Sequence, residues 1–176
     1  MKEEGKHGRR RFCLLPSVFC LAASVLLLPA CGFQLRGVAN LPFESIYVQA
    51  ASKSLLAQEI KRAVRAGSST RVIEQPDQAE VTLQIINELQ ERQILSLTGG
   101  GRVAEYQLRY RVQFRLTDAQ KRERIPASEI LLSRDYSYRD DQVLSKESEE
   151  ALYYRDMRSD AVQQLIRRLQ VAKLTS

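Results

Sequence analysis

A segment near the middle of the chain alternates apolar and polar residues without interruption, from Glu105 to Leu116. A β-strand points successive side chains to opposite faces, whereas a helix repeats every 3.6 residues or so. No helix accommodates this alternation, so the segment predicts a strand with one face in a core and the other in water. The core face comprises Tyr106, Leu108, Tyr110, Val112, Phe114 and Leu116, and the wet face comprises Glu105, Gln107, Arg109, Arg111, Gln113 and Arg115.

Weaker alternation on both sides of this segment predicts three more strands, over residues 43–50, 79–90 and 130–138. The glycine-rich run that begins at Thr98 predicts an antiparallel hairpin between the second strand and the central one. The expected apolar side of the second strand consists of Ala79, Val81, Leu83, Ile85 and Leu89.

Helical spacing of apolar residues predicts two helices, over residues 52–66 and about 146–169. The element order is therefore strand, helix, three strands, helix. A right-handed crossover places the first helix on one face of the sheet, and the last helix can cover the same face. We expect an α+β fold in which two helices pack on one face of a four-stranded sheet.

The beginning of the chain has the pattern of a bacterial lipoprotein leader. Residues 1–11 are rich in Lys and Arg, residues 12–30 are almost wholly apolar, and Leu28-Pro29-Ala30-Cys31 is close to a lipobox. We expect that residues 1–30 are removed and that the Cys31 thiol carries a diacylglyceryl group. An uncleaved membrane anchor is the alternative, because 19 apolar residues just reach spanning length.

Removal of this leader would leave a lipidated tether at 31–40 and a single domain at 41–176. The only histidine, His7, and two of the three cysteines, Cys13 and Cys20, would leave with it, and the net charge would fall from +6 to +3. The remaining domain then has no histidine and no free thiol for nucleophilic catalysis or metal ligation. We therefore expect no enzyme, no metal site, no cofactor other than the lipid on Cys31, and no nucleic-acid partner.

Three motifs resemble the LptE family, the lipopolysaccharide-assembly lipoproteins of the Gram-negative outer membrane. They are Cys31-Gly32-Phe33-Gln34-Leu35-Arg36-Gly37, Ala104-Glu105-Tyr106-Gln107, and Ala161-Val162-Gln163-Gln164-Leu165-Ile166-Arg167-Arg168-Leu169. The resemblance implies a non-catalytic domain that faces the periplasm and plugs the lumen of the LptD β-barrel in a 1:1 complex. It also implies lipopolysaccharide binding, delivery of lipopolysaccharide to the cell surface, and help with folding of the barrel. Gly32, in place of Asp after Cys31, favours the outer membrane.

The resemblance and the basic pattern together suggest six candidate contacts to lipopolysaccharide. Lys146 matches a basic family position at the start of the last helix. Arg102 is the nearest basic residue to a family arginine in the second hairpin, and Arg92 is a further candidate. Phosphate groups favour arginine for bidentate pairing, which adds the strand residues Arg109, Arg111 and Arg115.

Two alternatives stay open on the sequence. Each of these cations could belong to an ordinary solvated surface. The chain could also be an accessory lipoprotein of another envelope lipid transporter of the ABC type.

Overall fold

The computed structural model describes residues 40–138 and 143–172, and describes side chains from Glu147 onward in the second range. The leader, Cys31 and most of the tether lie outside the described residues. In chain order the elements are β1 (Ser45–Gln49), α2 (Leu55–Gly67), β2 (Arg71–Ile73), a short 3₁₀ turn η1 (Pro76–Gln78), β3 (Val81–Leu97), β4 (Val103–Asp118), β5 (Glu123–Ser137) and α3 (Val143–Gln170). None of the helices in these ranges is both long and apolar enough to cross a bilayer.

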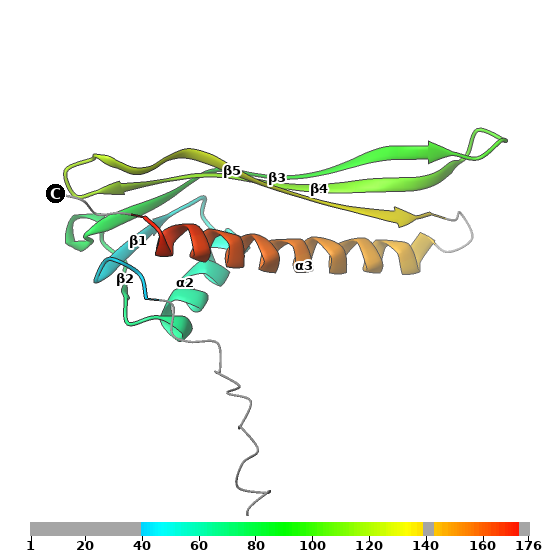
Figure 1. The fold of residues 1–176 in the computed structure, drawn as a ribbon. Helices are drawn as coiled ribbons and strands as arrows, with labels where there is room; N and C mark the ends of the chain where they lie inside the picture. Colours follow the sequence, from blue (N-terminus) through cyan, green and yellow to red (C-terminus); the bar gives the residue numbers. More distant parts are fainter. Residues whose placement is uncertain (1–39, 139–142, 173–176) are drawn as a thin grey trace, which may run out of the picture. The chain divides into compact units, whose positions relative to one another are not determined.

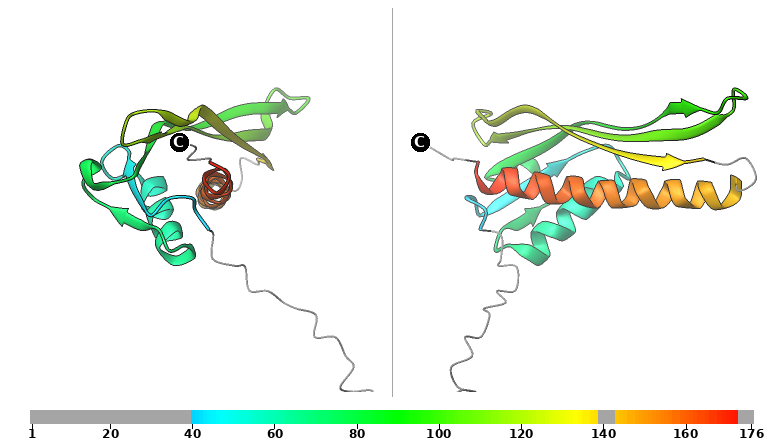
Figure 2. Two further views of the ribbon diagram at one scale, coloured as in Figure 1. Left: turned by 60° about the vertical axis from the view of Figure 1, so that its left-hand side comes forward. Right: turned by 45° about the vertical axis from the view of Figure 1, so that its right-hand side comes forward.

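The strands form one mixed sheet in the order β2-β1-β3-β4-β5, and both α2 and α3 lie on the same face of it (Figures 1 and 2). The α+β class and the two helices on one face are confirmed. The predicted strand count is wrong by one, because β2 also pairs with β1. With only three residues, β2 is too short to show an alternating pattern.

Strand β4 follows the predicted alternation along most of its length. Leu108, Tyr110, Val112, Phe114 and Leu116 are fully buried, while the Gln and Arg residues between them are partly exposed. β4 pairs in antiparallel fashion with β3 on one side and β5 on the other. Its buried face therefore supplies the middle of the core under both helices.

Strand β3 departs from the predicted pattern at a register shift between Ile85 and Asn87. A bulge of this kind inserts one residue, so the side chains from Asn87 to Ile94, where the next register shift follows, change face. Glu88 then lies opposite Val112 on the helix side, and Leu89 is 39% exposed on the other side. The prediction that Leu89 belongs to the apolar core face of this strand is therefore wrong.

The buried side of the bulge is stabilised by a polar junction between α2 and the sheet. The Ser54 hydroxyl caps α2 by accepting a hydrogen bond from the Ala57 N–H at 3.1 Å, and it donates to the Glu88 carboxylate at 3.0 Å. The Tyr110 hydroxyl donates to the other oxygen of Glu88 at 2.6 Å. Burial, and then this hydrogen bond, raise the pKa of Tyr110.

Helix α3 packs along the sheet through the predicted stripe. Its buried residues include Met157, Ala161, Leu165 and Leu169, and the helix begins at Val143, three residues before the expected start. Arg158 of α3 donates to Glu59 of α2 at 2.8 Å. Its side chain is only 12% exposed, so this ion pair joins the two helices.

The Glu88 junction generates a stability prediction. We expect Tyr110→Phe to destabilise the domain by about 1.5–3 kcal/mol, because it removes a hydrogen bond to a half-buried carboxylate. Urea unfolding would measure the change. Tyr47→Phe is the matched control, since no described residue forms a hydrogen bond with the Tyr47 hydroxyl, and its effect should lie within about 0.5 kcal/mol. Equal midpoints for the two variants would contradict the proposed importance of the junction.

Candidate functional site

The β3–β4 turn and the start of α3 lie at the same end of the sheet (Figures 1 and 2). The topology explains this proximity, because β5 runs back to Ser137 opposite Glu105, and α3 begins at Val143 shortly afterwards. Arg102 in the turn, Arg92 near the end of β3 and Lys146 in the first turn of α3 are therefore brought to one end. We call this the hairpin end of the sheet.

Arg92 at the hairpin end is engaged within the protein. Its Nη1 donates to Glu150 of α3 at 2.9 Å, and its guanidinium lies 4.8 Å from the centre of the Tyr106 ring. The hydrogen bond from Arg92 to Glu150 raises the pKa of Arg92. Glu150 also accepts from the Tyr136 hydroxyl at 3.0 Å. Arg92 therefore holds α3 against the sheet, although 48% of its side chain stays exposed.

Tyrosines surround this ion pair and fill the space between the hairpin end and α3. The Tyr106 ring stacks on Tyr136 at 5.8 Å and meets Tyr138 edge-on at 5.1 Å. Burial, followed by the hydrogen bond to Glu150, raises the pKa of Tyr136 to about 12. The Tyr154 hydroxyl donates to the Glu91 carbonyl at 2.8 Å, which ties the helix to β3 directly.

Arg109, Arg111 and Arg115 lie on the opposite face of the sheet, away from both helices. Arg111 lies between two carboxylates, 3.9 Å from Glu91 and 3.7 Å from Glu129. Its charge is thus compensated across three neighbouring strands. The structure separates this face from the hairpin end, so the six predicted residues do not form one cluster.

The other two arginines of this face differ in their partners. Arg115 donates to Gln84 at 2.7 Å and lies 3.8 Å from Glu123. Arg109 donates to Gln107 at 2.8 Å, and it forms no ion pair with the described residues. Arg109 is therefore the least compensated cation of the face.

Arg102 is less constrained than Arg92 at the hairpin end. Its backbone closes the turn, since the Arg102 carbonyl accepts from the Thr98 N–H at 2.7 Å and Gly101 adopts a positive φ of 75°. The exposed Arg102 side chain forms no ion pair with the described part of the chain. Lys146 is helical, and its side chain lies outside the described residues.

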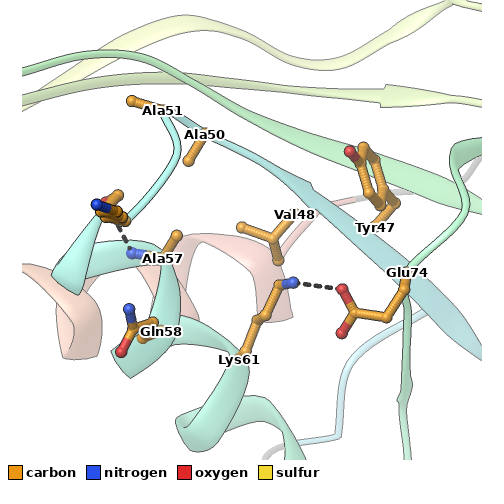
Figure 3. Close-up of a pocket in the computed structure, with 10 residues that line it drawn as sticks. Tyr47, Val48, Ala50, Ala51, Ala57, Gln58, Lys61 and Glu74 are labelled. Carbon is orange, nitrogen blue, oxygen red and sulfur yellow. Dashed lines mark hydrogen bonds and ion pairs between the residues drawn. The ribbon is translucent and has the colours of Figure 1, made fainter.

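A second basic feature lies away from the hairpin end, in a hollow of about 270 Å³ beside β1 and the start of α2 (Figure 3). The Lys61 ammonium at its rim bonds to Glu74 at 2.7 Å. That hydrogen bond lowers the pKa of Glu74. Glu74 thus neutralises Lys61, while Lys53 also lines the hollow.

Sequence reasoning missed the residues that organise the hairpin end. Glu150 and Tyr106 contact Arg92. Glu88 lies on the helix side of β3 because the bulge reverses the faces of that strand. No local signal marks these pairings, since Arg92 and Glu150 are 58 residues apart.

Comparison with known families gives one match that spans most of the domain. The family described as LptE, lipopolysaccharide-assembly, matches residues 43–169. The LPS-assembly lipoprotein LptE of Yersinia enterocolitica is 29% identical over 160 residues, which cover 86% of this chain and 73% of that protein. The protein of the same name from Yersinia pestis is 29% identical over 157 residues, covering 85% and 72%.

Solved structures show the same fold. An uncharacterized lipoprotein B from Nitrosomonas europaea, solved by NMR, has 38% identity and a TM-score of 0.70, and the match covers 79% of this chain and 90% of that one. The rare lipoprotein B from Shewanella oneidensis has 24% identity and a TM-score of 0.63, with 71% and 92% covered. The second likeness shows the fold alone.

The Arg92–Glu150 pair generates a prediction about the first half of α3. We expect Glu150→Gln to speed amide hydrogen exchange in residues 147–153 severalfold, because the variant weakens the contacts to Arg92 and Tyr136. Glu147→Gln is the matched control, since Glu147 is exposed in the same helix and forms no ion pair with the described residues. Identical exchange in both variants would show that the pair does not hold the helix.

Proposed function

The chain belongs to the LptE family of lipopolysaccharide-assembly lipoproteins, and we propose that it acts as the lipid-anchored plug subunit of a lipopolysaccharide translocon. In this proposal the domain sits in the lumen of an LptD β-barrel as a 1:1 complex in the outer membrane. It binds lipopolysaccharide, supports its assembly at the cell surface, and helps the barrel fold. The work is binding and scaffolding, with no bond made or broken.

The observation that carries the ligand-binding part is the unequal compensation of the candidate cations. Carboxylates of the protein already neutralise Arg92, Arg111 and Arg115. Arg102 forms no ion pair with any described residue and projects from the turn at the hairpin end. A phosphate at Arg102 gains a charge-assisted hydrogen bond without first displacing an internal partner. We therefore rank Arg102 above the strand arginines, and Arg109 next. Lys146 remains a candidate through the family resemblance alone.

The family match favours this role over that of an accessory to another envelope transporter.

A mature lipoprotein carries several acyl chains, and two or more chains hold a protein on a bilayer durably. Acylation at Cys31 would thus keep the domain beside a barrel in the same membrane.

Charge removal at two arginines tests the ligand site. We expect Arg102→Gln to weaken binding of purified lipopolysaccharide about tenfold, because one charge-assisted contact is worth about 1.5 kcal/mol. Arg115→Gln, the matched control, should change the affinity less than twofold, since its charge is already compensated. Titration of the isolated domain with lipopolysaccharide would measure both affinities.

A separate measurement of the complex with LptD shows whether Arg102 contacts lipopolysaccharide or the barrel. Co-purification of Arg102→Gln with LptD from outer membranes should match that of the unchanged protein. Lost co-purification with unchanged lipopolysaccharide affinity would assign Arg102 to the protein interface instead. No LptD complex with the unchanged protein would refute the plug role.

The lipid anchor has its own test. We expect mass spectrometry of the protein from a Gram-negative host to find a chain that starts at Cys31 and carries a triacylated N-terminus. Cys31→Ala should abolish the modification and release the domain from washed membranes. A chain of full length in the membrane would instead support the uncleaved anchor.

A further inference from the structure

Strand β3 leaves most of one edge without a neighbour. β1 pairs with β3 only from Val81 to Gln84, whereas β4 pairs with β3 as far as Leu97. In the described ranges no strand lies beside residues 85–97 on the side of β1. Figure 1 shows the same arrangement, with β3 extending well beyond β1. An unpaired edge of this kind presents a row of backbone donors and acceptors to any incoming strand.

The alternation of backbone groups identifies the amides on this edge. Successive residues of a strand direct their N–H and C=O groups to opposite neighbours. On β4, the Asp118 N–H donates to the Arg122 carbonyl and the Ala104 carbonyl accepts from the Tyr138 N–H, so the backbone groups of even-numbered residues point toward β5. The backbone groups of the odd-numbered residues between them therefore point toward β3. Gln107 is one of these and lies opposite Gln93, which therefore bonds to β4. Gln90, three positions earlier, directs its N–H to the open edge.

Exposed apolar side chains concentrate on the same segment. Nine large apolar side chains are exposed in the described residues, and five of them lie between residues 85 and 97 of β3. Clustering of this kind marks interaction surfaces, whereas isolated exposed apolar residues are ordinary. The five are Ile86, Leu89, Ile94, Leu95 and Leu97, with exposed fractions from 39% to 59%.

The usual protections against strand addition are weak along this edge. Proteins block such edges with proline and lysine, and residues 85–97 contain neither. Register shifts occur after Ile85 and after Ile94, but the pairing between Asn87 and Ile94 is regular. This regular stretch of eight residues, whose ends lie roughly 23 Å apart at about 3.3 Å per residue, is thus available for pairing.

The size of the surface selects the kind of partner. The five half-exposed aliphatic side chains are divided between the two faces of β3, since Leu89 lies opposite Arg111 and Ile94 lies opposite Tyr106. Each face therefore offers less than about 300–600 Å² of apolar surface, and a stable interface buries about 1,200–2,000 Å² in total. Pairing of two copies through this edge alone would fall short of that area. The edge suits an extended segment that belongs to a larger protein with further contacts elsewhere on the domain.

We propose that the open edge of β3 receives an extended, apolar-rich segment of a larger partner protein, which adds a strand to the sheet in line with β1. Main-chain hydrogen bonds to Gln90 and Arg92 would set the register, and the exposed leucines and isoleucines would pack on the guest. The identity of the partner rests on the proposed function, under which the LptD barrel supplies this segment.

Two proline variants of matched residues test the proposal. Gln90→Pro removes an N–H that faces the open edge, so the domain should keep its fold, with a melting temperature within about 2 °C of the unchanged protein. Its co-purification with co-expressed LptD should fall about tenfold, because the ring blocks strand pairing. Gln93→Pro removes an N–H that bonds β4, and it should lower the melting temperature clearly. Unfolding of Gln90→Pro would overturn the assignment of the edge.

Hydrogen exchange in the complex provides the second measurement. The amides of Gln90 and Arg92 should exchange at least tenfold more slowly in the purified LptD complex than in the free domain. Two results together would overturn strand addition and leave the proposed function standing. They are normal complex formation by Gln90→Pro and, in the unchanged protein, exchange at the Gln90 and Arg92 amides that does not slow when LptD binds. Failure of the unchanged protein to bind LptD would instead refute both the proposed function and the assigned partner.

Discussion

The alternation of apolar and polar side chains along β4 organises the core of this domain. One face of the strand carries five fully buried side chains from Leu108 to Leu116, and its two edges pair with β3 and β5. Helix α3 packs over that buried face, α2 packs on β1, β2 and α3, and the polar face is left to water. Because side chains on a strand have a strict period of two, a shift of one residue in β4 would expose the whole core.

Charge compensation divides the basic residues by role. Arg92 and Arg158 connect helices to the sheet or to each other, and Arg111 bridges carboxylates across strands. Such cations are structural, since a ligand phosphate would have to displace an internal partner. Arg102 has no such partner among the described residues, which makes it the better candidate for an anionic ligand. A basic sequence pattern alone does not distinguish these two groups.

The hairpin end combines the features expected of a contact surface. It holds an uncompensated arginine, part of the open edge of β3 and the exposed side chains of Ile94, Leu95 and Leu97. The other end of the domain is closed by α2 and by compensated pairs such as Lys61 with Glu74. This division agrees with a domain that makes its contacts through the hairpin half of a long sheet.

The fold class, the two helices, the core face of β4 and the family can be predicted from the sequence, because each rests on local periodicity or on contiguous motifs. The faces of β3 beyond Ile85, the role of Arg92 and the presence of β2 become visible only in the folded domain. A bulge reverses faces without any change in composition, and the partners of Arg92 lie far away in the chain. Such features depend on register and long-range contact, which local patterns do not encode.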